Sequence, residues 1–192
     1  MKVALIACSN GLGHIRRLLC ISKELIKLGA NPYLFAPKEK AIHLISSNQL
    51  KKIPYLIEFN CRTNSNYWGK EYTHKDDFLN WLPDLSSYEI IISDNLIEVL
   101  KIRADAILSG TFFWHRTFKN ICDKKYNICE DLLAKYCPKI ISSELFAPEY
   151  IITRKNYKKV GLFKLKNTNL YRNKSKNILI SSGTGGNSEN LV

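Results

Sequence analysis

The sequence predicts an α/β protein built on a mainly parallel, doubly wound sheet of the Rossmann-like type. The chain opens with an apolar run, a glycine-containing turn and then a segment of helical periodicity. Further short apolar runs alternate with helical segments, as expected for βαβ units joined by right-handed crossovers. With 192 residues, 45% of them hydrophobic, the chain is long enough for one sizeable core of this kind.

The first βα unit is the clearest part of the pattern. Lys2 to Cys8 is predicted to be a strand buried on both faces, because it is apolar after its first residue. Ser9 to Gly13 breaks the strand, the helical pattern runs from Ile15, and Gly29 stands where a left-handed residue would end the helix. Ligands of such sheets gather at the carboxyl ends of the strands. We therefore expect His14 at the mouth of a cleft, beside the positive end of a helix dipole.

The remaining elements alternate in the same way. Strands are predicted at residues 31–36, 52–59, 88–93, 106–112, 139–143 and 157–163. Helices are predicted at residues 38–47, 78–85, 96–102 and 117–136, the last with an interruption near 124–127. Pro54 cannot donate a ladder hydrogen bond, so the strand at 52–59 is expected at a sheet edge. Residues 60–72 are polar and are predicted to form an exposed loop.

The C-terminal part of the sequence predicts a change of domain. Residues 1–164 form the predicted N-terminal domain, and residues 165–176 are a polar, basic linker without hydrophobic periodicity. Residues 177–182 then read as a buried strand, followed by a glycine turn at 183–187 and the first turn of a helix. We therefore expect residues 177–192 to be the truncated start of a second domain.

The chain is basic, with a formal net charge of +12. Residues 151–177 contain nine basic and no acidic side chains, which fits a solvated face, contact with a membrane surface or nucleic-acid binding. The aromatic signature of an RNA-binding sheet is missing, so no nucleic-acid partner is expected. No apolar run could span a bilayer and no secretory signal is recognisable, so we expect a cytoplasmic location, with peripheral contact at the inner face of the membrane as an open alternative.

The six cysteines show no C-x-x-C spacing. Without an export signal they are expected to be reduced and mostly buried. No ligand set for a metal can be assembled from the sequence, so neither a metal nor another cofactor is expected.

Four side chains are candidates for a site. An imidazole can exchange a proton near neutral pH, so His14 is a candidate base, although it could also only cap the helix or bind the loop. Arg17, one turn further on, is either an anchor for the loop or a phosphate, or a plain surface charge. Asp94 ends a predicted strand and either contacts a sugar hydroxyl or caps the following helix. His115, just past another strand, is a further candidate cleft residue.

Gly11-Leu12-Gly13-His14-Ile15-Arg16-Arg17 resembles the G-x-G-H-x-x-R pattern that opens the N-terminal domain of many GT-B glycosyltransferases. The likeness is greatest to nucleotide-sugar transferases related to the lipid-linked N-acetylglucosaminyltransferase of peptidoglycan synthesis. The UDP-sugar hydrolase of pseudaminic acid synthesis carries a similar Gly-His-x-x-Arg. Asp94 after Ile-Ile-Ile-Ser, and the strand and glycine loop at residues 178–187, also look like parts of these proteins.

The resemblance implies transfer of a sugar from a nucleotide sugar, in the main a UDP-sugar, to a lipid-linked or cell-envelope glycan acceptor. It implies that His14 is the base or acceptor-orienting group. The substrate-binding residues would be Gly11, Gly13, Arg17, Asp94 and His115. The residues implied at the donor phosphates are Ser182, Gly183, Thr184, Gly185, Gly186 and Asn187. GT-B enzymes as a rule need no bound metal for the chemistry.

The sequence departs from the family pattern because only the first part of a donor domain is present. We therefore expect the chain alone to be inactive. Two alternatives stay open, a nucleotide-sugar hydrolase and a non-catalytic acceptor-binding subunit that works with a separate donor-domain chain. A nicotinamide-dependent enzyme is disfavoured, because the third glycine of the dinucleotide fingerprint is missing and no acidic residue follows near Phe35.

Overall fold

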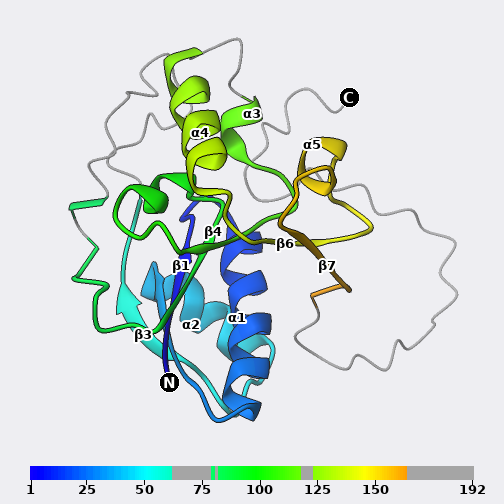
Figure 1. Ribbon diagram of the computed structural model, residues 1–192. Coiled ribbons are helices and arrows are strands. Elements are labelled where there is room, and N and C mark those ends of the chain that lie inside the picture. The colour runs from blue at the N-terminus through cyan, green and yellow to red at the C-terminus, as the bar shows by residue number, and fades with distance from the viewer. Residues whose placement is uncertain (62–78, 81, 118–122, 164–192) are drawn as a thin grey trace, which may run out of the picture.

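The fold is a seven-stranded sheet flanked by helices (Figure 1). The computed structural model describes residues 1–61, 79–80, 82–117 and 123–163. Each strand pairs in parallel with its neighbours. The predicted α/β, Rossmann-like doubly wound architecture is therefore confirmed.

The elements alternate along the chain. The strands are β1 (Lys2–Ala7), β2 (Asn31–Ala36), β3 (Tyr55–Glu58), β4 (Ile90–Asp94), β5 (Ile107–Ser109), β6 (Ile140–Ser143) and β7 (Tyr157–Val160). The helices are α1 (Leu12–Lys27), α2 (Lys38–Ser47), the 3-10 helix η2 (Ile97–Lys101), α3 (Trp114–Thr117), α4 (Asp123–Tyr136) and α5 (Glu149–Ile152).

The strand order β3-β2-β1-β4-β5-β6-β7 contains one reversal of direction. From β1 the chain moves outward to β2 and β3, then returns to the other side of β1 and moves outward again from β4 to β7. The reversal places the carboxyl ends of β1 and β4 side by side. In open α/β sheets this switch point is where a crevice forms, because the two connecting segments leave in opposite directions.

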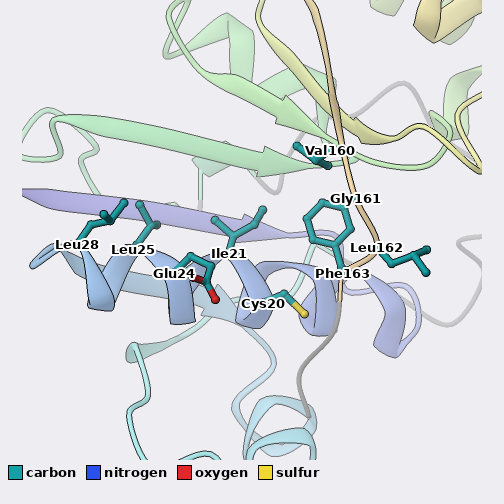
Figure 2. A pocket seen from close by; sticks show the side chains of 9 residues that line it. All are labelled: Cys20, Ile21, Glu24, Leu25, Leu28, Val160, Gly161, Leu162 and Phe163. Atoms are coloured by element: carbon teal, nitrogen blue, oxygen red, sulfur yellow. The ribbon is translucent and has the colours of Figure 1, made fainter. Parts of the chain in front are cut away.

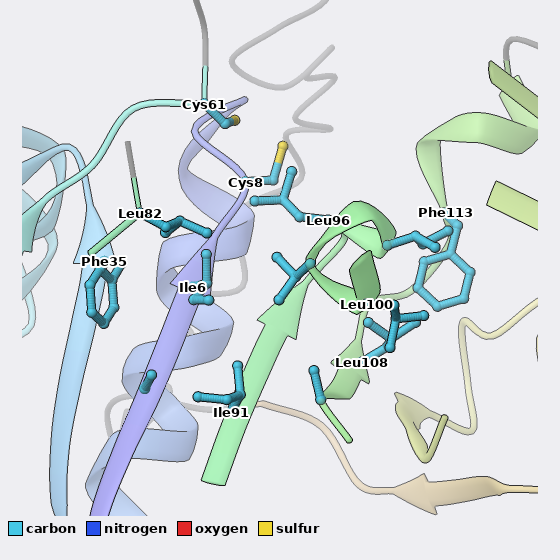
Figure 3. Packing of buried hydrophobic residues seen from close by; sticks show 14 of the residues in the cluster. Ile6, Cys8, Phe35, Cys61, Leu82, Ile91, Leu96, Leu100, Leu108 and Phe113 are labelled. Carbon is cyan, nitrogen blue, oxygen red and sulfur yellow. The ribbon is translucent and has the colours of Figure 1, made fainter. Parts of the chain in front are cut away.

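The central strand β1 is buried on both faces, as its apolar sequence predicts. Ala4, Ile6 and Cys8 belong to one core cluster, and the alternate residues of β1 belong to the other. Figure 3 shows Ile6 of β1, Ile91 of β4 and Leu100 of η2 in the first cluster. Helices α1 and α2 pack on the second face, since their apolar residues join that cluster. The two core clusters therefore cover both faces of the central strand and fix the position of its carboxyl end.

Several predicted boundaries are confirmed and others are wrong. The strand at Asn31–Ala36 and the helix at Lys38–Ser47 have the predicted bounds, and β3 lies at a sheet edge as predicted. The strand predicted at 106–112 is only Ile107–Ser109, and the helix at 96–102 is a 3-10 helix. Gly29 has a φ of 80° just past α1, as expected of a helix-ending glycine.

Two further helix predictions are wrong, and a short helix was missed. Residues 79–80 form only a 3-10 turn and residues 82–85 are not helical, since Pro83 disfavours the α conformation of the residue before it. Helix α4 runs without a break through residues 124–127. The four-residue α5 was not predicted, because one turn is too short to show periodicity.

Five cysteines lie among the described residues and all are free thiols, four buried and Cys137 exposed. Among the described residues, no helix is both long and apolar enough to cross a membrane. The predicted exposed loop beyond residue 61, the linker and the start of a second domain lie outside the described residues.

Candidate functional site

A fully buried carboxylate, that of Asp94, lies at the switch point and is held by three side chains. His14 Nδ1 lies 2.7 Å from Oδ1. Arg17 donates from Nε to Oδ2 at 2.6 Å and from a terminal nitrogen to Oδ1 at 3.2 Å. The Ser109 hydroxyl donates to Oδ2 at 2.5 Å. We call these four residues the Asp94 cluster.

The sheet brings the Asp94 cluster together. Asp94 is the last residue of β4 and lies opposite Ala7 of β1 on one side and Ser109 of β5 on the other. The main chain fixes it further, because the Cys8 amide donates to the Asp94 carbonyl at 3.1 Å. Asn95 follows with a φ of 63°, a left-handed conformation that asparagine tolerates better than most residues. The carboxylate is thus held by rigid strands rather than by a loop.

Helix α1 supplies both nitrogen groups of the Asp94 cluster. The helix begins at Leu12, three residues earlier than predicted, so His14 lies inside its first turn. His14 and Arg17 are three residues apart, which places them on the same side of the helix. Asp94 therefore receives both side chains from one direction.

The two motif glycines have different roles. Gly11 precedes α1 with a φ of 85°, so the turn requires a residue without a Cβ. Gly13 has no such φ, and a Cβ added there would meet open space. Of the two glycines of the G-x-G-H-x-x-R pattern, only Gly11 is therefore required by the turn. Gly13 instead leaves the surface beside His14 without a side chain.

The charges of the Asp94 cluster are balanced. Burial alone would raise the pKa of Asp94, but the Arg17 guanidinium and the hydrogen bond from His14 outweigh burial, so the pKa lies below its ordinary value. Asp94 is therefore a carboxylate at neutral pH. A carboxylate can only accept, so the His14 ring donates from Nδ1; in the neutral ring, Nε2 would then be the nitrogen without a proton. This is the arrangement of a base oriented by an acid.

A cysteine pair fixes the loop between β1 and α1. The Ser9 amide donates to Cys61 Sγ at 3.2 Å, and the Cys61 amide donates to the Ser9 hydroxyl at 2.9 Å. The sulfurs of Cys8 and Cys61 lie close together (Figure 3). A hydrogen bond from Cys8 lowers the pKa of Cys61 to about 7, although burial opposes the shift. Sequence reasoning missed this pair, since 53 positions separate the two residues and no spacing rule relates them.

A pocket of about 320 Å³ adjoins the Asp94 cluster at the carboxyl edge of the sheet. Its lining residues are Gly13, Arg16, Arg17, Thr111, Ser143, Phe146, Leu162 and Phe163. His14 is 6% exposed and is not part of the lining, so the ring lies beneath the surface between two lining residues of its own helix. Of this pocket and the two described next, only this one is lined by a member of the Asp94 cluster, Arg17.

Two other pockets are poorer candidates for the chemistry. An apolar groove of about 340 Å³ runs between α1 and residues 160–163, where Ile21, Leu25 and Phe163 form its walls (Figure 2). A larger pocket of about 440 Å³ includes Ile90 and Ile107, which begin β4 and β5. That pocket lies at the amino edge, whereas ligands of doubly wound sheets bind at the carboxyl edge.

His115 belongs to a second buried cluster, apart from His14. Its Nε2 lies 2.6 Å from Glu130 of α4, which also accepts a hydrogen bond from Arg154 at 2.9 Å and forms an ion pair with Arg116 at 2.9 Å. Burial lowers the pKa of His115, outweighing the effect of Glu130. The side chain is 3% exposed and lines none of the three pockets described above. The cluster joins α3, α4 and the segment after α5, and it fits a structural role better than a place in the cleft.

His115 should make the protein less stable in acid. Because its pKa in the folded state lies below the ordinary 6.5, the unfolded state binds a proton first as the pH falls below that value. The free energy of unfolding should therefore fall as the pH falls below 6.5, by up to about 1.4 kcal/mol per pH unit from this group. His115→Gln, which cannot titrate, should flatten this slope in urea unfolding curves. The exposed His43→Gln is the control, and equal slopes in all three proteins would contradict the prediction.

The structure brings together part of the predicted site. His14, Arg17 and Asp94 meet, and Arg17 is an anchor rather than a surface charge, with 11% of its side chain exposed. The alternative of Asp94 as a helix cap is wrong, because η2 has Leu96 at its N-cap and no capping side chain. Both oxygens of Asp94 are bound within the protein, which makes it a positioning residue.

Some site residues were missed and others are not described. Ser109, Arg16, Thr111 and Ser143 were not predicted. Ser143 ends a predicted strand, a position that could have marked it, whereas Ser109 and Thr111 fell inside the strand predicted at 106–112. The predicted phosphate-binding residues 182–187 lie outside the described residues.

Within the described part of the chain, no group of three or more His, Cys, Asp and Glu side chains is placed to hold a metal ion. No family model and no curated protein matches the chain.

Proposed function

We propose that the chain is the acceptor-side domain of a glycosyltransferase. The enzyme transfers a sugar from a nucleotide sugar, with a UDP-sugar as the preferred donor. The acceptor is a hydroxyl group of a lipid-linked or cell-envelope glycan. The observation that supports this most is the His14–Asp94 pair at the switch point, beside a pocket at the carboxyl edge of the sheet. The G-x-G-H-x-x-R resemblance supports the choice of glycosyl transfer among reactions that need a base.

In this proposal His14 takes the proton of the acceptor hydroxyl at Nε2 as the hydroxyl attacks the anomeric carbon. Asp94 holds the tautomer through Nδ1 and stabilises the imidazolium that forms. Arg17 keeps Asp94 ionised, and Ser109 completes its hydrogen bonding. The bond from the sugar to the nucleotide diphosphate breaks as the new bond forms, and residues 182–187 are proposed to receive that diphosphate.

The test is a product analysis. The full chain, both alone and completed by a donor domain, is incubated with a panel of UDP-sugars, with and without glycan and lipid-linked acceptors. UDP, free sugar and glycosylated product are measured by mass spectrometry. A glycosylated product supports the proposal. Release of free sugar in the absence of an acceptor would favour the alternative of a nucleotide-sugar hydrolase over the transferase. Saturable binding of an acceptor without any UDP release would favour the binding-subunit alternative, and the absence of both binding and release would overturn the proposal.

A further inference from the structure

We propose that the pocket beside His14 is a phosphate-binding site whose donors are Arg16, Thr111, Ser143 and the first turn of α1. As a statement about the substrate of the transferase it rests on the proposed function. As a binding site it rests on three observations, which are a buried hydroxyl without a partner, an unmatched positive charge and an open helix terminus.

The buried hydroxyl is that of Ser143. The residue ends β6, is 2% exposed and lines the pocket, yet its Oγ has no hydrogen-bond partner among the described residues. Leaving a buried hydroxyl unpaired is unfavourable, and most such groups have a partner. A ligand oxygen in the pocket would supply that partner.

The positive charge is that of Arg16. Arg17 also lines the pocket, but its guanidinium is already matched by Asp94. Arg16 is exposed and takes part in none of the ion pairs between described residues. No acidic side chain lines the pocket. The pocket therefore carries a net positive charge that a ligand anion would neutralise.

The helix terminus adds further donors. Helix α1 has sixteen residues, no capping side chain at Gly11 and no acidic residue in its first turn. Its first amides and the positive end of its dipole are therefore not satisfied by a side chain of the helix. Gly13 lines the pocket, and its open surface lets a ligand approach this turn. Helix N-termini bind phosphate in this way.

The donors favour phosphate over carboxylate. They come from three directions, which are α1, the segment after β5 with Thr111, and the end of β6 with Ser143. A phosphate monoester offers three free oxygens to such a set, whereas a carboxylate offers two. The opposite wall is apolar, with Phe146 64% and Leu162 62% exposed, which suits the carbon-bearing part of an ester. The ligand class is therefore an organic phosphate.

The experiment measures binding of phenyl phosphate to the full chain by calorimetry at constant ionic strength. Arg16→Ala should weaken binding about tenfold or more, the loss of about one charge-assisted hydrogen bond. Lys23→Ala removes the same charge from the same helix, outside the pocket, and should leave the Kd unchanged. Ser143→Ala should weaken binding several-fold, yet should not lower the stability of the free protein, because its hydroxyl has no partner to lose.

Two comparisons separate the ligand sources and the chemistry. The Kd of uridine monophosphate is compared with that of a long-chain alkyl phosphate, to distinguish a nucleotide phosphate from a lipid phosphate. If either ligand binds more tightly than phenyl phosphate, the result supports the site. Three results would each overturn the site. Benzoate could bind as tightly as phenyl phosphate, Arg16→Ala and Lys23→Ala could lower the affinity equally, or phenyl phosphate could show no saturable binding. Because none of these measurements needs turnover, the site can stand if the transferase proposal fails, and the reverse also holds.

Discussion

In the enzyme completed by a donor domain, His14→Ala should lower the turnover of the nucleotide sugar about a hundredfold or more while the protein stays folded. The reason is that, in the proposed mechanism, Nδ1 donates to Asp94 and Nε2 takes the proton of the acceptor. Loss of a positioned acid–base group costs 10²–10⁴-fold in rate on the usual scale. The measurement is UDP release under saturating donor and acceptor, together with a thermal unfolding curve for each variant.

His43→Ala is the matched control, because His43 is an exposed histidine on α2 away from the Asp94 cluster. It should leave turnover unchanged. If the folded His14→Ala variant turns over the nucleotide sugar as fast as the wild type, His14 has no part in the mechanism. A loss of turnover that accompanies unfolding would show His14 to be structural, so the unfolding curve decides between the two readings.

Asp94→Ala should destabilise the fold by about 3–5 kcal/mol, the usual cost of removing one partner of a buried ion pair. Asp94 is fully buried and the side chain of Arg17 is 11% exposed, so the variant leaves a guanidinium in the protein interior without its carboxylate. Urea unfolding near neutral pH measures the loss. Because the pKa of Asp94 is lowered, its contribution is complete at neutral pH and disappears only as the pH falls below the ordinary carboxyl value of 3.8.

The double variant Asp94→Ala with Arg17→Met separates an unpaired charge from a simple loss of packing. If the unpaired guanidinium causes the instability, the double variant should lose less than the sum of the two single variants. Asp84→Ala, at an exposed carboxylate, should leave the urea midpoint near that of the wild type. Additive losses in the double variant, or an Asp94→Ala midpoint no lower than that of Asp84→Ala, would contradict the interpretation.

The fold could be predicted because its signals are local. The uninterrupted apolar run of β1 identifies a strand buried on both faces, and Gly29 marks the end of α1. The errors lie where tertiary context decides the length of an element. Gly110 was expected inside β5, yet the strand ends at Ser109, and residues 97–101 form a 3-10 helix rather than an α-helix.

The candidate site could be predicted only in part, because its contacts are not local. His14 and Asp94 each followed a strand in the sequence, which is enough to place them at the same edge of a parallel sheet. That the two side chains touch depends on β1 lying beside β4, and no pattern in the sequence gives the strand order. For the same reason the partner of His115, which is Glu130 on α4, could not be foreseen.

His14 and Arg17 lie on consecutive positions of one helical face, and both contact a carboxylate at the end of a central strand. Any tilt or slide of α1 relative to β4 would therefore strain all three hydrogen bonds to Asp94 at once. Such a movement is opposed because it would leave a buried carboxylate without its partners. The His14–Asp94 alignment is thus set by the fold before a substrate binds.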